Sequence, residues 1–132
     1  TYMETKRLLL SRETNPFYFG NTLEEWMNDR ESMLGGIGSE DSSGNSGLGR
    51  VWPLSLISRL LVLLEEDEPD VNEAEAILST LRRCSGGTGL LHESFWYDDP
   101  TVLTREWFAM ANSLFGEAIY RVSEKYPEWL FL

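Results

Sequence analysis

The sequence predicts an all-α fold built from helices that pack in pairs. Two observations support this: apolar residues recur every three or four positions over long stretches, and no stretch alternates apolar and polar residues as a half-buried strand would. At 132 residues the chain has the length of one domain. We therefore expect a single helical unit spanning residues 1–132.

The N-terminal part is expected to hold two helices. The first covers residues 2–13 and ends before Asn15-Pro16, because the residue before a proline avoids helical geometry. The second covers residues 22–33 and begins with Thr22 and Glu25 at the spacing of a capping box. Phe17, Tyr18 and Phe19 between them are expected to pack onto the core.

Residues 35–49 are rich in glycine and serine and are predicted to form a flexible loop. The Gly-x-Gly at residues 36–38 is too short to indicate a phosphate cradle and lacks the lysine of a P-loop.

Three stronger helices are expected in the C-terminal part, over residues 52–64, 70–83 and 104–125. The first begins at Trp52-Pro53, since proline suits the first helical turn. Asp70 and Thr104 are the expected N-caps of the other two. The residues expected to face the core are Leu54, Ile57, Leu60, Leu61, Leu64, Ala74, Ile77, Leu78, Leu81, Phe108, Ala111, Leu114, Phe115, Ala118, Ile119 and Val122.

Charge and composition narrow the classes of function. The net charge is −11, from 22 acidic and 11 basic residues, and such a surface repels nucleic-acid phosphates and anionic membranes. No run is apolar enough to span a bilayer, no targeting signal is visible, and the single Cys84 leaves the compartment unknown. Because the chain opens at Thr1 rather than Met, we expect it to be a piece of something longer.

The aromatic content of 12% is open to two interpretations. The rings fill a core, or some of them stack on sugar faces, for which Trp26, Trp52, Trp96 and Trp107 are the candidates.

Catalytic chemistry is most plausible in the loop predicted for residues 86–103. The only histidine, His92, forms no recognisable nucleophilic set with a serine or with Cys84, and one His with one Cys cannot build a tetrahedral zinc site. Carboxylates remain, and glycoside hydrolysis needs two of them. Among Glu93, Asp98, Asp99 and Glu117, Glu93 is favoured because it follows a glycine-rich turn and has aromatic neighbours.

Long and unusual words in this sequence resemble glycoside hydrolase family 125, the exo-acting α-1,6-mannosidases, whose fungal branch is described as meiotically up-regulated. They are densest in the C-terminal half. The words are Leu10-Ser11, residues 15–19, 36–38, 52–57, 87–89 and 92–95, Asp98-Asp99, Thr104-Arg105, and residues 107–109 and 111–117. The resemblance implies the C-terminal part of an (α/α)6 barrel and removal of α-1,6-linked mannose by inversion, without a metal or other cofactor.

The same resemblance implies the roles of individual residues. Glu93 corresponds to the general base, whereas the general acid is an aspartate in an upstream region that this chain does not contain. The expected substrate-binding residues lie within the shared words. They are His92, Ser94, Trp52, Gly38, Arg105, Trp107 and Asn112. The expected partner is a mannose-containing glycan.

The chain also departs from the family pattern. Ser39-Glu40-Asp41 stands where the family usually carries a Pro-His pair, extra residues lie between Phe19 and Gly35, and Met110 replaces a family tryptophan. A second hypothesis is therefore a catalytically inactive, truncated helical domain that binds sugar or a protein partner. Under either hypothesis, barrel faces left uncovered would promote self-association.

Overall fold

The computed structural model describes residues 1–40 and 49–132, which form helices and short strands. The helices are α1 (Tyr2–Leu9), α2 (Leu23–Asn28), α3 (Pro53–Leu63), α4 (Val71–Arg83), α5 (Ala109–Lys125) and the short 3-10 helix η1 (Pro127–Phe131). The strands are β1 (Tyr18–Phe19), β2 (Gly36–Glu40), β3 (Gly49–Val51), β4 (Ser94–Trp96) and β5 (Asp99–Thr104).

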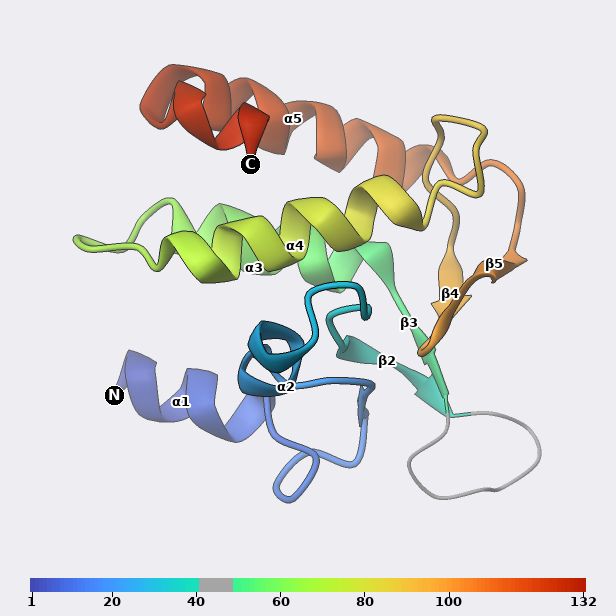
Figure 1. Ribbon diagram of the computed structural model, residues 1–132, viewed down its shortest axis with the longest axis horizontal. Coiled ribbons are helices and arrows are strands. Elements are labelled where there is room, and N and C mark those ends of the chain that lie inside the picture. The colour runs from blue at the N-terminus through green and yellow to red at the C-terminus, as the bar shows by residue number, and fades with distance from the viewer. Residues whose placement is uncertain (41–48) are drawn as a thin grey trace.

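The strands form one antiparallel sheet in the order β1-β2-β3-β4-β5, so each strand pairs with its neighbour in sequence. The all-α prediction is therefore wrong, and the chain is a mixed α/β structure. The described residues likewise form a helical layer beside a sheet rather than the expected arc of a barrel of paired helices (Figure 1). The strands were missed because most of them are too short for an alternating pattern to show.

Glycines in the segment predicted as a loop allow its ends to pair closely. A Cβ on Gly38 would lie 1.7 Å from the carbonyl oxygen of Arg50, and one on Gly49 would lie 2.6 Å from the Phe19 ring. Residues without side chains are thus required where β1, β2 and β3 meet. The prediction of a loop over residues 35–49 is wrong at 36–40 and at 49, and its centre, residues 41–48, lies outside the described residues.

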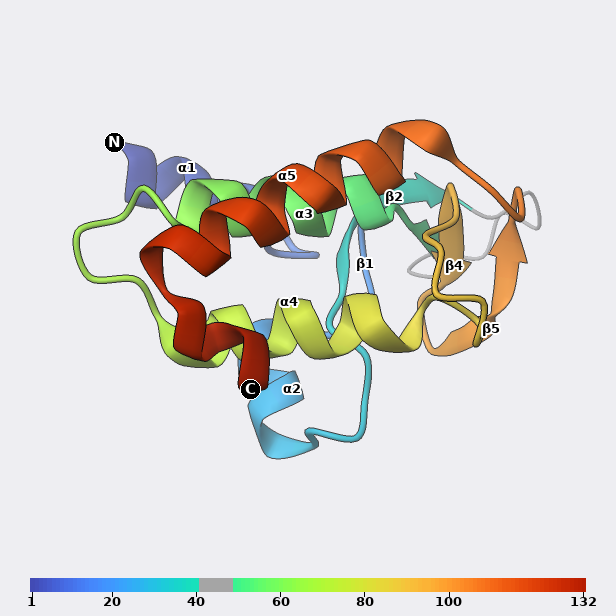
Figure 2. The same ribbon diagram turned by 90° about the horizontal axis from the view of Figure 1, so that it is seen from above.

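The core lies between the helices α3, α4 and α5 and the sheet. Figures 1 and 2 show α3 and α4 running side by side, with α5 packed against α3. Of the positions predicted to face inward, those buried are Ile57, Leu60, Leu64, Ala74, Ile77, Leu78, Leu81, Ala111, Ala118 and Val122. The sheet adds Val51 and Phe95, both without exposed surface, and Tyr18 and Phe19 are buried as expected while Phe17 is half exposed.

Several helix boundaries differ from the predictions. Thr22 and Glu25 do form the expected capping box, Pro53 does begin α3, and Asp70 does cap α4. However, α1 ends at Leu9 and α2 at Asn28, both earlier than expected. Thr104 caps no helix: it is the last residue of β5, and α5 begins only at Ala109.

An ion-pair network joins α1 to the helical layer. No residue of α1 is buried, yet Lys6 Nζ lies 2.9 Å from Glu66 Oε1 and 2.8 Å from Glu73 Oε2. The Nε of Arg59 on α3 lies 2.6 Å from the other oxygen of Glu73. The Glu73 side chain is only 4% exposed. Charge pairing rather than apolar burial therefore holds α1 in place. None of the described helices has the length and apolar character to cross a membrane.

Candidate active site

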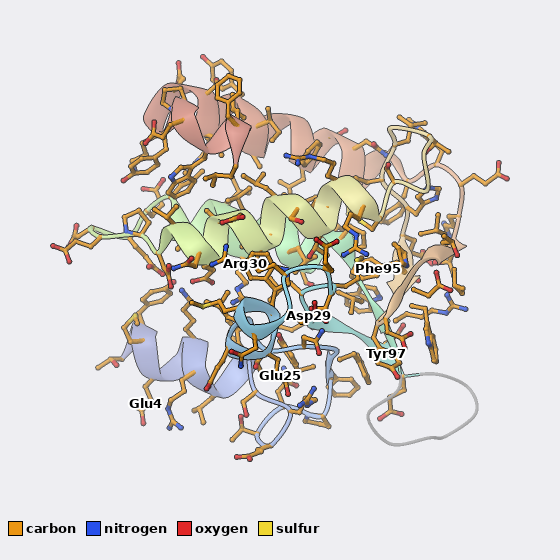
Figure 3. All side chains as sticks on the ribbon, viewed as in Figure 1. Glu4, Glu25, Asp29, Arg30, Phe95 and Tyr97 are labelled. Atoms are coloured by element: carbon orange, nitrogen blue, oxygen red, sulfur yellow. The ribbon has the colours of Figure 1, made fainter. Side chains whose placement is uncertain are left out.

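The antiparallel register gathers predicted site residues at one end of the sheet. Val51, the last residue of β3, lies opposite Phe95, and Ser94, the first residue of β4, lies opposite Thr104, the last residue of β5. This end of the sheet meets the helices, since β3 leads directly into α3 (Figure 1). Figure 3 shows Phe95 near that end and Tyr97 farther along the sheet. Trp52, Glu93 and Arg105 each adjoin a strand terminus there.

Glu93 is held at its backbone and at both carboxylate oxygens. Its amide donates to the Thr104 carbonyl at 3.1 Å. Its Oε2 lies 3.0 Å from Arg105 Nε, and its Oε1 accepts a longer hydrogen bond, 3.4 Å, from the Thr104 hydroxyl. The side chain remains 37% exposed. Oε2 is thus in an ion pair, whereas Oε1 accepts only one long hydrogen bond, and the side chain as a whole is partly exposed.

His92 supports the backbone beside this carboxylate. Its side chain is buried at 2% exposure, with Nδ1 2.8 Å from the Arg105 carbonyl oxygen and Nε2 3.3 Å from the Ser85 carbonyl oxygen. Arg105 has a φ of 51°, a left-handed conformation that is uncommon for a residue other than glycine. Such backbone persists where the surroundings hold it, and His92 supplies that hold.

Ser94 and Asn112 are engaged with neighbouring residues rather than open to solvent. The Ser94 hydroxyl lies 2.6 Å from the Thr104 hydroxyl in a buried position. The Asn112 amide brackets Leu91, accepting from its N–H at 3.0 Å and donating to its carbonyl at 2.9 Å. It also donates to the carbonyl of Phe108, so Asn112 ties the start of α5 to the segment that leads into β4.

The more exposed candidates differ in position. Arg105 and Trp107 are exposed at 67% and 61%, two residues apart after β5. Trp52 and Gly38 border a separate open groove of about 640 Å³, lined also by Leu9, Asn15, Phe17, Ile37, Ser39 and Glu40. Of the four candidate tryptophans, Trp26 is fully buried and belongs to the core. Glu93 does not line this groove, and it is also not among the residues that line three further hollows of the described residues, along α1 and beside η1.

The other candidate carboxylates have separate surroundings. Asp99 accepts hydrogen bonds from the hydroxyl and amide of Thr101, which lower the pKa of its carboxyl group. Glu117 lies on the exposed side of α5 and pairs with Arg121 at 2.8 Å. Only Glu93 combines partial exposure with several supporting contacts at the end of the sheet.

Sequence reasoning missed the place of Thr104 in this site. It was expected to cap a helix, but its hydroxyl contacts both Ser94 and Glu93. A usable signal was present: two short β-prone runs, residues 94–96 and 99–104, are separated by only two residues, which is the spacing of a tight hairpin.

Comparisons with known proteins identify what this chain is similar to. Residues 1–120 match the family model described as metal-independent alpha-mannosidase (GH125). The meiotically up-regulated gene 157 protein of Schizosaccharomyces pombe is 34% identical over 129 residues, which cover 98% of this chain and 22% of that protein.

A solved structure that is similar to this chain comes from the same class of enzyme. It is a metal-independent alpha mannosidase of Streptococcus pneumoniae in a non-productive complex with alpha-1,6-mannobiose, and it is 34% identical to this chain. The superposition has a TM-score of 0.64 and covers 92% of this chain and 24% of that one. The chain thus corresponds to a minor part of both relatives. Because the family model spans nearly all of its residues, this chain belongs to the metal-independent alpha-mannosidase family, GH125.

Proposed function

We propose that this chain supplies the general base of an α-mannoside hydrolase that releases α-1,6-linked mannose with inversion. Family membership supports the reaction class, and the mannobiose complex of the Streptococcus pneumoniae relative supports the substrate. The observation that carries the proposal is the state of Glu93, a partly exposed carboxylate whose Oε2 pairs with Arg105 and whose Oε1 accepts only one long hydrogen bond. A base must be fixed in position and still free to accept a proton.

In the proposed reaction Glu93 takes a proton from a water molecule. The water oxygen bonds to the anomeric carbon of mannose while the glycosidic carbon–oxygen bond breaks, and a general acid protonates the departing oxygen. That acid is the upstream aspartate implied by the family resemblance, so it lies outside this chain. In inverting enzymes the two carboxyl groups stand roughly 6.5–9.5 Å apart, which leaves room for the water.

The remaining candidates divide into two proposed roles. Arg105, Trp107 and Trp52 are exposed and are proposed to contact sugar directly, with Gly38 shaping the groove beside Trp52. His92, Ser94 and Asn112 are proposed to act through the backbone and side chains that they hold, because their polar groups are already engaged with protein.

The decisive variant is Glu93→Gln in the full-length polypeptide that carries this chain. General base assistance is typically worth about 10²–10⁴-fold, so kcat on α-1,6-mannobiose should fall by about that factor while mannobiose binding is largely retained. Glu117→Gln is the matched control, since Glu117 is a glutamate in an exposed ion pair on α5, and its kcat should stay normal. Near-normal kcat for Glu93→Gln would contradict the proposed base. A product of retained anomeric configuration would contradict inversion.

The isolated 132-residue chain is proposed to have almost no hydrolytic activity and to self-associate. It lacks the proposed acid, and large apolar side chains such as Met3, Met110 and Phe131 are exposed at 63%, 63% and 88%. Sedimentation should show concentration-dependent association. A monomeric species with strong hydrolytic activity would contradict the proposal that the general acid lies outside this chain, and it would also exclude the inactive-domain hypothesis.

A further inference from the structure

Thr104 makes more contacts with Glu93 than any role in strand pairing requires. Its carbonyl accepts from the Glu93 amide at 3.1 Å, and its hydroxyl lies 3.4 Å from Glu93 Oε1. The next residue, Arg105, binds the other carboxylate oxygen at 3.0 Å. The end of β5 therefore contacts the carboxylate at both oxygens, from two consecutive residues.

The Thr104 hydroxyl is itself held in place by Ser94. The two hydroxyl oxygens lie 2.6 Å apart, and Ser94 is only 2% exposed, so water competes little for this bond. A hydroxyl has a single proton to donate. If Thr104 directs its proton to Glu93, Ser94 must be the donor in the bond between the two hydroxyls. The two hydrogen bonds then run in one direction, from Ser94 to Thr104 and from Thr104 to the carboxylate of Glu93.

We infer that Thr104 is a positioning residue for the carboxylate of Glu93 and that Ser94 orients its hydroxyl. The inference rests on the proposed function, since it assigns a role in placing the base. The hydroxyl favours one rotation of the carboxylate about its last bond without locking it, because the 3.4 Å contact is long and leaves Oε1 able to accept a proton from water. Arg105 fixes the other oxygen and so completes a two-point clamp.

A purely structural role for Thr104 makes a different prediction. In that case its hydroxyl would matter only because Ser94 would otherwise be a buried hydroxyl without a partner, which is itself costly. Removing both hydroxyls together relieves that cost but does not restore a lost contact to Glu93. The two roles are therefore separated by comparing the single and double variants.

The test uses Thr104→Val, Thr104→Ser and the double variant Ser94→Ala with Thr104→Val in the full-length polypeptide, with α-1,6-mannobiose as substrate. One hydrogen bond is worth about 0.5–1.5 kcal/mol, so Thr104→Val should lower kcat by about 2- to 13-fold with KM changed by a smaller factor. Thr104→Ser keeps the hydroxyl and should restore kcat to within about twofold. The double variant should melt at a higher temperature than Thr104→Val yet keep its low kcat.

Thr101→Val is the matched control. Thr101 lies on the same strand, and its hydroxyl also bonds a carboxylate, that of Asp99 at 2.6 Å, but it makes no contact with Glu93. Its kcat should be unchanged. Full kcat in Thr104→Val, recovery of kcat in the double variant, or failure of Thr104→Ser to rescue would each overturn the inference. Glu93→Gln measured in parallel separates the role of Thr104 from the proposed function. An inactive Glu93→Gln beside a fully active Thr104→Val would contradict only the positioning role of Thr104 and would leave Glu93 as the proposed base.

Discussion

Glu73 and Glu93 both pair with an arginine, but the two sites differ in what surrounds the carboxylate. Glu73 is 4% exposed, and its oxygens are taken by Arg59 at 2.6 Å and by Lys6 at 2.8 Å. Glu93 is 37% exposed, with one oxygen 3.0 Å from Arg105 and the other only loosely bonded. A carboxylate enclosed by cations on both sides can only hold structure together, whereas one that is fixed on one side and open on the other can exchange a proton.

The comparison is most sharply tested by removing the Glu73 charge. Glu73→Gln removes the negative charge that pairs with Lys6 and Arg59 at a largely buried position. Breaking a buried ion pair in this way costs about 3–5 kcal/mol of folding free energy. Urea unfolding of the full-length polypeptide should show a loss of that size. Glu75→Gln on the same helix is the control, because its pair with Arg30 is largely open to solvent and should contribute less than about 1 kcal/mol. Equal losses in the two variants would mean that the Glu73 network is not a buried anchor.

Removing the side chain that supports the Glu93 segment is expected to lower the free energy of unfolding by less than Glu73→Gln does. Asn112→Ala removes the bracket on Leu91 and leaves its largely buried backbone groups without their partner, which costs about 1–3 kcal/mol. Hydrogen exchange should show faster exchange of the Leu91 amide, which bonds Asn112, and Asn72→Ala on α4 should leave it unchanged. Unaltered exchange at Leu91 would show that Asn112 does not hold the segment that leads to Glu93.

The network around Glu73 should also define a pH window of stability. Burial lowers the pKa of Lys6, but its hydrogen bonds to Glu73 and Glu66 outweigh burial, so that the pKa is raised above 10.5. Burial raises the pKa of Glu66, but hydrogen bonds from Lys6 and Tyr2 bring it below 4.5. The Lys6 contribution is complete below 10.5 and is lost as pH rises through the folded pKa, while the Glu66 contribution is present above 4.5 and is lost as pH falls through its folded pKa.

The measurement is the unfolding free energy against pH for the unaltered protein and for the double variant Lys6→Met with Glu66→Gln. The difference between them should be largest between pH 4.5 and 10.5 and should shrink outside that window on both sides. A difference that does not vary with pH would show that charge pairing does not hold α1 to the helical layer.

The helices could be predicted from sequence because their signals are local and long. The three-four spacing located α3 and α4, and the capping box at Thr22 and Glu25 marked the start of α2. The sheet could not be predicted in the same way. Its strands are two to six residues long, and β2 and β3 contain glycines that pair closely without showing an apolar pattern.

The candidate site was only partly accessible from sequence. The glycine turn and the aromatic neighbours favour Glu93 among the carboxylates, and the family resemblance implies its role as general base. The partners of its carboxylate depend on the register that places Ser94 opposite Thr104, a non-local pairing that local patterns do not reveal. The resemblance also implied that His92 binds sugar. The contacts of its ring with the carbonyl groups of Arg105 and Ser85 are non-local as well and could not be read from local patterns.

We propose that Glu93, the partly exposed carboxylate, does chemistry and that Glu73, the enclosed one, maintains structure. The most direct test measures kcat on α-1,6-mannobiose and the melting temperature together, for Glu93→Gln and Glu73→Gln in the same full-length polypeptide. We expect Glu93→Gln to lose about 10²–10⁴-fold in kcat at an almost unchanged melting temperature, and Glu73→Gln to melt earlier while each folded molecule keeps its kcat. The reverse pattern, with turnover surviving in Glu93→Gln and lost in folded Glu73→Gln, would contradict the account.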